Sequence, residues 1–153
     1  LAATSPAHHV RVQVDPGAAV VGDEEALRRV VANLVRNALV HTPGGTHVLV
    51  TVHEQPSSVQ IDVVDDGPGM SDDVAHQVFE RFYRADASGN IPGTGLGMCV
   101  VKEIVELHGG EVEVASTQGV GTTVTVWIPA AGQKPLVAQE IVAESEAERL
   151  DTW

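Results

Sequence analysis

The sequence predicts an α+β domain, a two-layer α/β sandwich in which one mixed five-stranded sheet carries three helices on one face. Two observations support this fold class. Apolar residues recur at every second position in short runs, as in strands with one buried face, and at three- and four-residue spacing in longer runs, as in amphipathic helices. Along the chain these runs follow the order strand, helix, strand, strand, helix, helix, strand, strand.

The composition limits what kind of protein this is. At 153 residues, 43% of them hydrophobic, the chain is long enough for one domain with its own core. Cys99 is the single cysteine, so no internal disulfide can form. A net charge of −12 disfavours nucleic acid as a partner, and no apolar stretch reaches the roughly 20 residues of a membrane span, so we expect no direct membrane contact. The chain begins with Leu1 instead of Met, and we expect it to be a fragment of a longer protein.

The first strand and the first helix have clear signals. HVRVQVD, residues 9–15, alternates with period two and predicts a strand. Asp23 is expected to cap a helix whose first turn holds Glu24 and Glu25, where the helix dipole favours negative charge. Residues 43–45, a proline and two glycines, end this helix. Its buried stripe would consist of Leu27, Val30, Val31, Leu34, Val35 and Ala38.

A hairpin and a second helix follow. β-Branched residues recur at every second position of 48–52 and of 59–63, around the turn EQPSS, and predict two paired strands. Ser71 is expected to cap a helix over SDDVAHQVFERFY, residues 71–83, because two aspartates lie in its first turn. The small and polar residues 85–94 predict a mobile loop.

The last third of the domain holds a helix and a closing hairpin. Residues 96–108 predict the third helix, which a glycine pair ends. Its inward positions would be Val100, Val101, Ile104 and Val105. EVEVAST, residues 111–117, and TTVTVWI, residues 122–128, predict the hairpin. Because residues 131–153 are acidic and weakly periodic, we expect the domain to span residues 1–130 and a flexible tail to follow.

Asp65 is the first candidate site residue, in DDGPG, residues 65–69. In period two it continues the buried face of the strand before it, whereas Asp66 points to the other face. A buried carboxylate is costly unless it is hydrogen-bonded. We therefore expect Asp65 either to accept amides of its own turn or to accept a hydrogen bond from a ligand.

A polar flank of the first helix is the second candidate. Asn33, Asn37 and His41 are spaced four apart, so they lie in one row beside the apolar stripe. Asparagine is a poor helix former, so two of them on one flank need a reason. An amide oxygen suits Mg²⁺, which otherwise keeps waters and phosphate oxygens around it. A solvated helix face is the alternative.

The loop GTGLG, residues 93–97, is the third candidate. Its amides, together with the N-terminus of the helix that follows, suit phosphates. The loop is not a dinucleotide fingerprint, because Met98 stands where the sixth position requires glycine, and no Gly-Lys-Ser/Thr follows as in a Walker loop. Glycines stand at alternate positions in both GTGLG and DDGPG, which indicates that the backbone of each loop lies close to another group. We expect the two loops to approach the same ligand.

Five motifs occur in one order: NLVRNA at 33–38, DDGPG, FERFYR at 79–84, GTGLG, and GVGT at 119–122. Over residues 9–129 the chain resembles the catalytic, ATP-binding domain of two-component sensor histidine kinases. These belong to an ATPase superfamily that also holds gyrase, mismatch-repair and chaperone ATPases. The resemblance implies a Bergerat-type ATP-binding fold with ATP and Mg²⁺ as cofactors.

The resemblance also implies roles for single residues. Asp65 would accept a hydrogen bond from the adenine amino group, and Gly67 and Gly69 would let the base lie close. Asn37, with Asn33, would hold Mg²⁺ against the phosphates. The other residues implied at the nucleotide are His41, Phe82, Gly93, Thr94, Gly95, Leu96, Gly97 and Thr122. Arg81 or Arg84 would reach phosphate oxygens during catalysis. Phe79 and Phe82 would anchor a lid over the nucleotide, and core packing is the alternative role for both phenylalanines.

The chain departs from the family pattern at two positions of the first helix. Val40 stands where histidine kinases often carry Lys or Arg, and His41 where Tyr or Phe is common. Asn33 stands where hydrolytic relatives have a general-base glutamate, and an amide cannot take a proton. Asn33 therefore favours a histidine kinase over an ATPase or a serine kinase of the same superfamily. Val40 supports a further alternative, a nucleotide-binding sensory module with degenerate catalysis.

No histidine of this chain matches the phosphoacceptor pattern, in which an acidic residue follows directly and a proline later. His53 begins HEQP, but it ends a strand and the proline is too close, while neither the pair His8–His9 nor His108 has the acidic neighbour. We therefore expect the acceptor on a dimerisation domain of the same parent chain. The resemblance further implies a response regulator as partner and a cytoplasmic location, with the parent anchored in the membrane.

Overall fold

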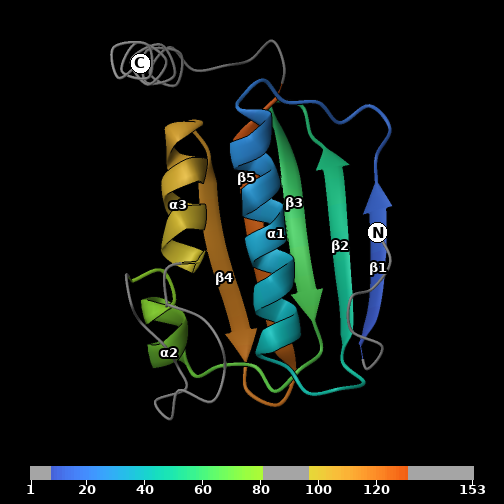
Figure 1. The fold of residues 1–153 in the computed structure, drawn as a ribbon, viewed down its shortest axis with the longest axis vertical. Coiled ribbons are helices and arrows are strands. Elements are labelled where there is room, and N and C mark those ends of the chain that lie inside the picture. Colours follow the sequence, from blue (N-terminus) through green and yellow to red (C-terminus); the bar gives the residue numbers. More distant parts are fainter. Residues whose placement is uncertain (1–7, 81–96, 131–153) are drawn as a thin grey trace.

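A computed structural model describes residues 8–80 and 97–130. Its elements follow the predicted order (Figure 1). They are β1 (His9–Val14), α1 (Glu24–Val40), β2 (His47–Glu54), β3 (Ser58–Asp65), α2 (Asp72–Gln77), α3 (Gly97–Leu107), β4 (Glu111–Thr117) and β5 (Gly121–Pro129). The predicted tail after residue 130 lies outside the described residues.

The five strands form one mixed sheet in the order β1-β2-β3-β5-β4. β1 runs parallel to β2, with α1 as the crossover, and all other pairs are antiparallel. Figure 1 shows α1 and α3 side by side on one face of the sheet, with α2 beside one end of β4. The predicted two-layer α+β sandwich is therefore confirmed, and the other face of the sheet carries no described helix.

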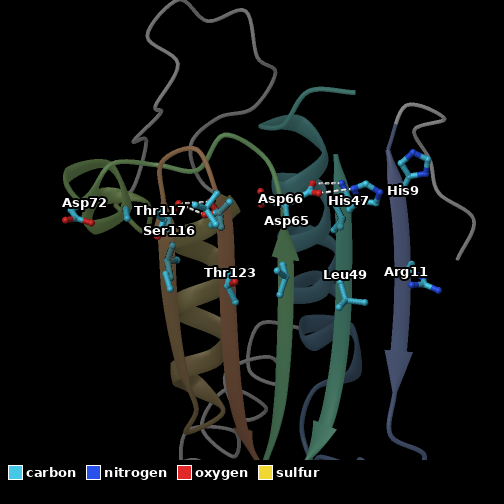
Figure 2. A pocket seen from close by; sticks show the side chains of 18 of the residues that line it. His9, Arg11, His47, Leu49, Asp65, Asp66, Asp72, Ser116, Thr117 and Thr123 are labelled. Atoms are coloured by element: carbon cyan, nitrogen blue, oxygen red, sulfur yellow. Dashed lines mark hydrogen bonds and ion pairs between the residues drawn. The ribbon is translucent and has the colours of Figure 1, made fainter. Parts of the chain in front are cut away.

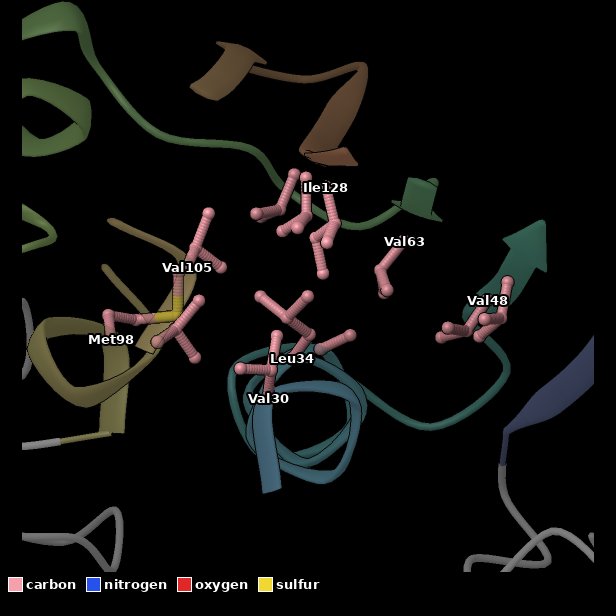
Figure 3. Packing of buried hydrophobic residues seen from close by; sticks show 12 residues of the cluster. Val30, Leu34, Val48, Val63, Met98, Val105 and Ile128 are labelled. Atoms are coloured by element: carbon pink, nitrogen blue, oxygen red, sulfur yellow. The ribbon is translucent and has the colours of Figure 1, made fainter. Parts of the chain in front are cut away.

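The core lies between the sheet and the pair α1 and α3 (Figure 3). Val30 and Leu34 of α1 point at the sheet, and Met98 and Val105 of α3 close the layer from the side. The fully buried side chains share an apolar and mostly β-branched character, and they are Leu34, Ile128, Val30, Val48, Val101, Val105 and Val126. Burying each one stabilises the fold by roughly 1.5–3 kcal/mol before the entropy of ordering is counted.

The capping signals predicted where helices begin, whereas helical propensity did not predict where α2 ends. Asp23 caps α1 by accepting a hydrogen bond from Ala26 N, and Ser71 caps α2 by accepting one from Val74 N, as predicted. The prediction that the second helix covers residues 71–83 is wrong in length, because α2 ends at Gln77. After it, Val78 and Phe79 pack against the core, so the chain turns inward instead of continuing along the surface.

The inward face of α3 is rotated from the predicted one. Met98 and Cys99 are buried with the predicted Val101 and Val105, while Val100 is only half-buried. Ile104, also half-buried, still packs against the core. The long Met98 side chain reaches the core from a position at the edge of the apolar stripe, which period alone did not identify.

His108 joins the end of α3 to the start of α1. The ring is buried, its Nε2 accepts a hydrogen bond from Asp23 N at 3.1 Å, and its Nδ1 lies 2.8 Å from Ile104 O. Because Nε2 accepts, the proton of the neutral ring is on Nδ1, which donates to Ile104.

His108→Ala is therefore expected to lower the free energy of unfolding by about 1–3 kcal/mol, the cost of leaving buried groups without their partner. His53→Ala, at an exposed position with an ion pair of 3.8 Å, should change it by less than about 0.5 kcal/mol. Urea titration of both variants checks this, and equal effects of the two substitutions would contradict the role of His108.

Candidate functional site

A row of polar side chains crosses three strands at one end of the sheet. Asp65 of β3 pairs directly with Thr122 of β5, and Thr122 pairs directly with Ser116 of β4. Directly paired residues of antiparallel strands project to the same face. The next pairs along the strands, Val63 with Val124 and Val124 with Val114, are apolar. The polar row therefore borders the core on the face that the helices cover.

Asp65 is nearly buried within this row, at 9% exposure. Its Oδ1 accepts a hydrogen bond from Gly67 N at 2.9 Å. Burial raises the pKa of the Asp65 carboxyl above its ordinary value, although hydrogen bonds from the backbone of Gly67 and Thr122 favour the charged form. The predicted turn role of Asp65 is thus present, and the carboxylate still has lone pairs for a ligand.

Asp66 lies on the opposite face, as the strand phase predicts. Its two carboxylate oxygens accept hydrogen bonds from His47 N at 2.7 Å and His47 Nδ1 at 2.8 Å (Figure 2). These hydrogen bonds hold the pKa of Asp66 below its ordinary value. Asp66 therefore ties the end of β3 to the start of β2 and takes no part in the polar row.

The two neighbouring aspartates are expected to affect stability with opposite signs. The pKa of Asp65 is raised by folding, so its charge opposes folding, and Asp65→Asn should stabilise the protein at neutral pH. This gain should disappear as the pH falls through the raised pKa toward the ordinary value of 3.8. The pKa of Asp66 is lowered, so Asp66→Asn should destabilise above pH 3.8, and this loss should fade as the pH falls through the lowered pKa. Thermal melts from acid to neutral pH check both signs, and shifts of the same sign would contradict them.

Gly69 explains one of the close approaches that the glycines predict. Its φ is +69°, and a Cβ there would lie 2.1 Å from the carbonyl oxygen of Thr117. Beside it, Gly119 N donates to Pro68 O at 2.7 Å. DDGPG is therefore held against the turn between β4 and β5, and part of the close approach is to protein backbone.

Thr42 fills the space above Gly67. A Cβ on Gly67 would lie 2.6 Å from Thr42 Cγ2, so only glycine fits without movement. Thr42 Oγ1 donates to Ala38 O at 2.6 Å and lies 2.9 Å from His8 Nε2. Thr42 is not among the residues that the sequence predicts for the site, and only its place directly after His41 pointed to it.

The polar flank of α1 begins close to Gly97, the first residue of α3. Asn33 and Asn37 are both half-buried, and Asn33 Oδ1 lies 4.0 Å from where a Cβ on Gly97 would be. The flank thus starts beside the first residue of α3 and continues toward His41, the exposed C-cap of α1. The structure thus places Asn33 beside Gly97.

Seven predicted site residues lie outside the described residues: Arg81, Phe82, Arg84, Gly93, Thr94, Gly95 and Leu96. The predicted mobile loop, residues 85–94, lies there too. Phe79 is described and packs against the core, with Lys102 Nζ 5.8 Å from the centre of its ring. Core packing, the alternative role for Phe79, is therefore present.

A broad hollow on the uncovered face of the sheet is a different feature. Figure 2 shows it with Arg11 and Leu49, whose side chains project from the face opposite the helices. It reaches the polar row only at the ends of the strands. His47 and Asp66 line this hollow from the uncovered face, and the three residues of the polar row, Asp65, Thr122 and Ser116, border it where their strands end.

The donor set on α1 fits Mg²⁺ better than a metal that needs several charged ligands. Within residues 8–80 and 97–130 no group of three His, Cys, Asp or Glu side chains converges to hold a metal. The amide oxygens of Asn33 and Asn37 are hard ligands, and Mg²⁺ is commonly held by few protein ligands together with waters and phosphate oxygens.

Comparisons with known proteins agree with this geometry. A family model described as "Histidine kinase-, DNA gyrase B-, and HSP90-like ATPase" matches residues 22–132. The sensor-like histidine kinase SenX3 of Mycolicibacterium smegmatis is 39% identical over 115 residues, which cover 74% of this chain and 30% of the relative. The signal transduction histidine-protein kinase/phosphatase MprB of Mycolicibacterium paratuberculosis is 38% identical over 148 residues, 94% of this chain and 28% of the relative. The chain thus spans less than a third of the length of these relatives.

Solved structures show the same fold. A mycobacterial sensor histidine kinase MprB structure superposes with a TM-score of 0.71 at 34% identity, over 80% of this chain and 82% of that one. Full-length ShkA in complex with AMPPNP gives a TM-score of 0.71 at 28% identity, over 84% of this chain and 27% of that one.

Proposed function

The chain belongs to the family of histidine kinase-, DNA gyrase B- and HSP90-like ATPases, and we propose that it binds Mg-ATP and transfers the γ-phosphoryl group to a histidine of its parent sensor kinase. The observation that carries this proposal is that two features, the polar row and the polar flank of α1, occur together in one structure. The polar row offers a buried acceptor, Asp65, and the α1 flank offers amide oxygens beside the start of α3.

The base would lie at the polar row. Asp65 is buried, hydrogen-bonded on one side by Gly67, and placed beside Thr122. An ionised carboxylate only accepts hydrogen bonds, and the adenine amino group donates them. The base is proposed to lie close to this loop, where Gly67 and Gly69 add no side chains and where Thr42 and the Thr117 carbonyl occupy part of the space.

The phosphates would lie toward the start of α3. Backbone N–H groups at a helix N-terminus favour negative charge, and Gly97 is the first residue of α3. Asn33 and Asn37 would hold Mg²⁺ there, and the ion, when bound, neutralises phosphate charge. Arg81, Arg84 and the loop 93–97 are proposed to complete the phosphate site.

Phosphoryl transfer to histidine is the reaction that these residues suit. A neutral imidazole nitrogen attacks the γ-phosphorus, the bond from that phosphorus to the β,γ-bridging oxygen breaks, and ADP leaves. The protein then needs mainly to position the groups and to stabilise charge. Hydrolysis would need a base for water, and Asn33 cannot accept a proton.

A nucleotide-binding sensory module with degenerate catalysis is the second candidate. Val40, the last residue of α1, is half-buried and apolar at the position where relatives often carry a cation. If the remaining cations do not compensate, the chain would bind nucleotide with little transfer.

The partners follow from the same proposal. The acceptor histidine would lie on a dimerisation domain of the parent chain, which would pass the phosphoryl group to a response regulator. The parent would be anchored in the membrane with this domain in the cytoplasm. None of the helices in the described part of the chain is long and apolar enough to cross a membrane.

Incubation with radiolabelled ATP and Mg²⁺ tests the proposal. The isolated chain should stay unlabelled, because none of its seven histidines fits the acceptor pattern and two of them, His8 and His108, are buried. The dimerisation domain of the parent, added as a separate chain, should become labelled on histidine. Strong labelling of this chain alone would contradict the proposal, and ATP binding without any transfer would favour the sensory module.

A further inference from the structure

Ser116 connects the loop after β3 to the hydroxyl of Thr122. Its Oγ accepts a hydrogen bond from Met70 N at 2.7 Å and donates one to Gly121 O at 3.2 Å. It also lies 2.7 Å from Thr122 Oγ1, and geometry alone lets either hydroxyl donate in that pair. Figure 2 shows Ser116 and Asp65 at the same end of the sheet.

One hydrogen-bond arrangement of Ser116 uses both contacts of its hydroxyl with the protein backbone. A serine hydroxyl has one hydrogen and two lone pairs. When that hydrogen goes to Gly121 O and one lone pair accepts from Met70 N, a lone pair is what remains for Thr122. In this arrangement Thr122 donates to Ser116, and the outward lone pairs of Thr122 Oγ1 can only accept.

We infer that Ser116 is a positioning residue for base selectivity, because it fixes the Thr122 hydroxyl as a hydrogen-bond acceptor beside the Asp65 carboxylate. The inference rests on the proposed function, in which Asp65 faces the amino group of adenine. Asp65 and Thr122 are direct partners in the sheet, so the two acceptors lie side by side.

Two adjacent acceptors discriminate between purines. The amino group of adenine has two hydrogens to donate, whereas guanine has a carbonyl oxygen at that position. Without the Ser116 hydroxyl, the Thr122 hydroxyl can rotate and donate to that carbonyl oxygen. Loss of Ser116 should therefore weaken the rejection of guanine more than it weakens the binding of adenine.

Titration of ATP and GTP against wild type, Ser116→Ala and Ser116→Thr tests the inference. Ser116→Ala should lower the ratio of ATP affinity to GTP affinity by about 2- to 12-fold, the value of one hydrogen bond between neutral groups. Ser116→Thr keeps the hydroxyl and should restore the ratio. If Ser116→Ala weakens both nucleotides equally, Ser116 only ties down the loop at Met70, and the inference is wrong.

Thr122→Val provides a second test that does not depend on the folding of Ser116→Ala. It should lower the ratio of ATP affinity to GTP affinity by itself. Ser116→Ala added to it should lower this ratio no further, because both substitutions remove the same hydrogen bond between the two hydroxyl groups. An unchanged ratio in Thr122→Val, or an additive fall in the double variant, would refute the inference. A wild type that binds no ATP would refute the proposed function as well, whereas a wild type that prefers ATP while the variants keep its ratio refutes this inference alone.

Discussion

Asn37→Ala is expected to reduce phosphotransfer to an added acceptor domain below detection, and to weaken ATP binding mainly when Mg²⁺ is present. Removing one well-placed electrostatic group from an active site typically costs about 100- to 1,000-fold in rate. Asn37 lies half-buried on the α1 flank, one turn after Asn33, and the start of α3 is beside that flank. The substitution would remove a ligand of the ion, so without Mg²⁺ the variant should bind ATP almost as wild type does.

The matched control is Arg36→Ala, the preceding and exposed residue of the same helix. It removes a larger side chain from α1 but none from the flank. ATP affinities of both variants, measured with Mg²⁺ and with a chelator, separate the two roles. Equal losses of affinity for Asn37→Ala in both conditions would show a structural role for this asparagine.

The sequence predicted features that local chemistry determines. The Asp23 cap and the Ser71 cap each depend on a side chain and a backbone amide three residues later, so the local sequence is enough to predict them. The opposite directions of Asp65 and Asp66 follow from strand period alone, and the hydrogen bonds of both residues confirm them.

Features that depend on contacts between residues far apart in the sequence were not predictable from local sequence. The position of Ser116 beside Thr122 follows from the register of β4 against β5, and His108 meets Asp23 across 85 residues of sequence. The early end of α2 is of the same kind, because it reflects core space that accepts Val78 and Phe79. Helical propensity up to residue 83 contains no information about that space.

The same distinction applies to Gly67 and Gly69. Their spacing predicts that the backbone of the loop lies close to another group, but it does not say whether that group belongs to a ligand or to the protein. The structure shows that Thr42 and the Thr117 carbonyl occupy part of that space. The missing Cβ atoms of the two glycines therefore also allow the loop to pack against its neighbours, and the proposed ligand role of the loop depends on Asp65.

Asp65→Ala is expected to weaken ATP binding by about 10- to 150-fold and to narrow the preference for ATP over GTP. A hydrogen bond to a charged group contributes roughly 1.5–3 kcal/mol, which corresponds to that range of affinity. Guanine already lacks this bond, because its carbonyl oxygen would face the carboxylate, so GTP should lose little. Asp65→Asn is the isosteric comparison, since its amide can still accept from Gly67 N but can also donate to guanine.

Asp66→Ala is the control that makes this prediction specific to one face of β3. It removes a carboxylate one position away, whose hydrogen bonds to His47 tie strands together on the exposed face. It should lower the melting temperature slightly and leave ATP affinity within about threefold of wild type, the range of a surface substitution. Titration with fluorescent ATP and GTP analogues, on samples shown to be folded, compares the variants. If Asp66→Ala proves more damaging to ATP binding than Asp65→Ala, the base cannot lie on the helix-covered face, and the assignment of Asp65 to adenine is wrong as well.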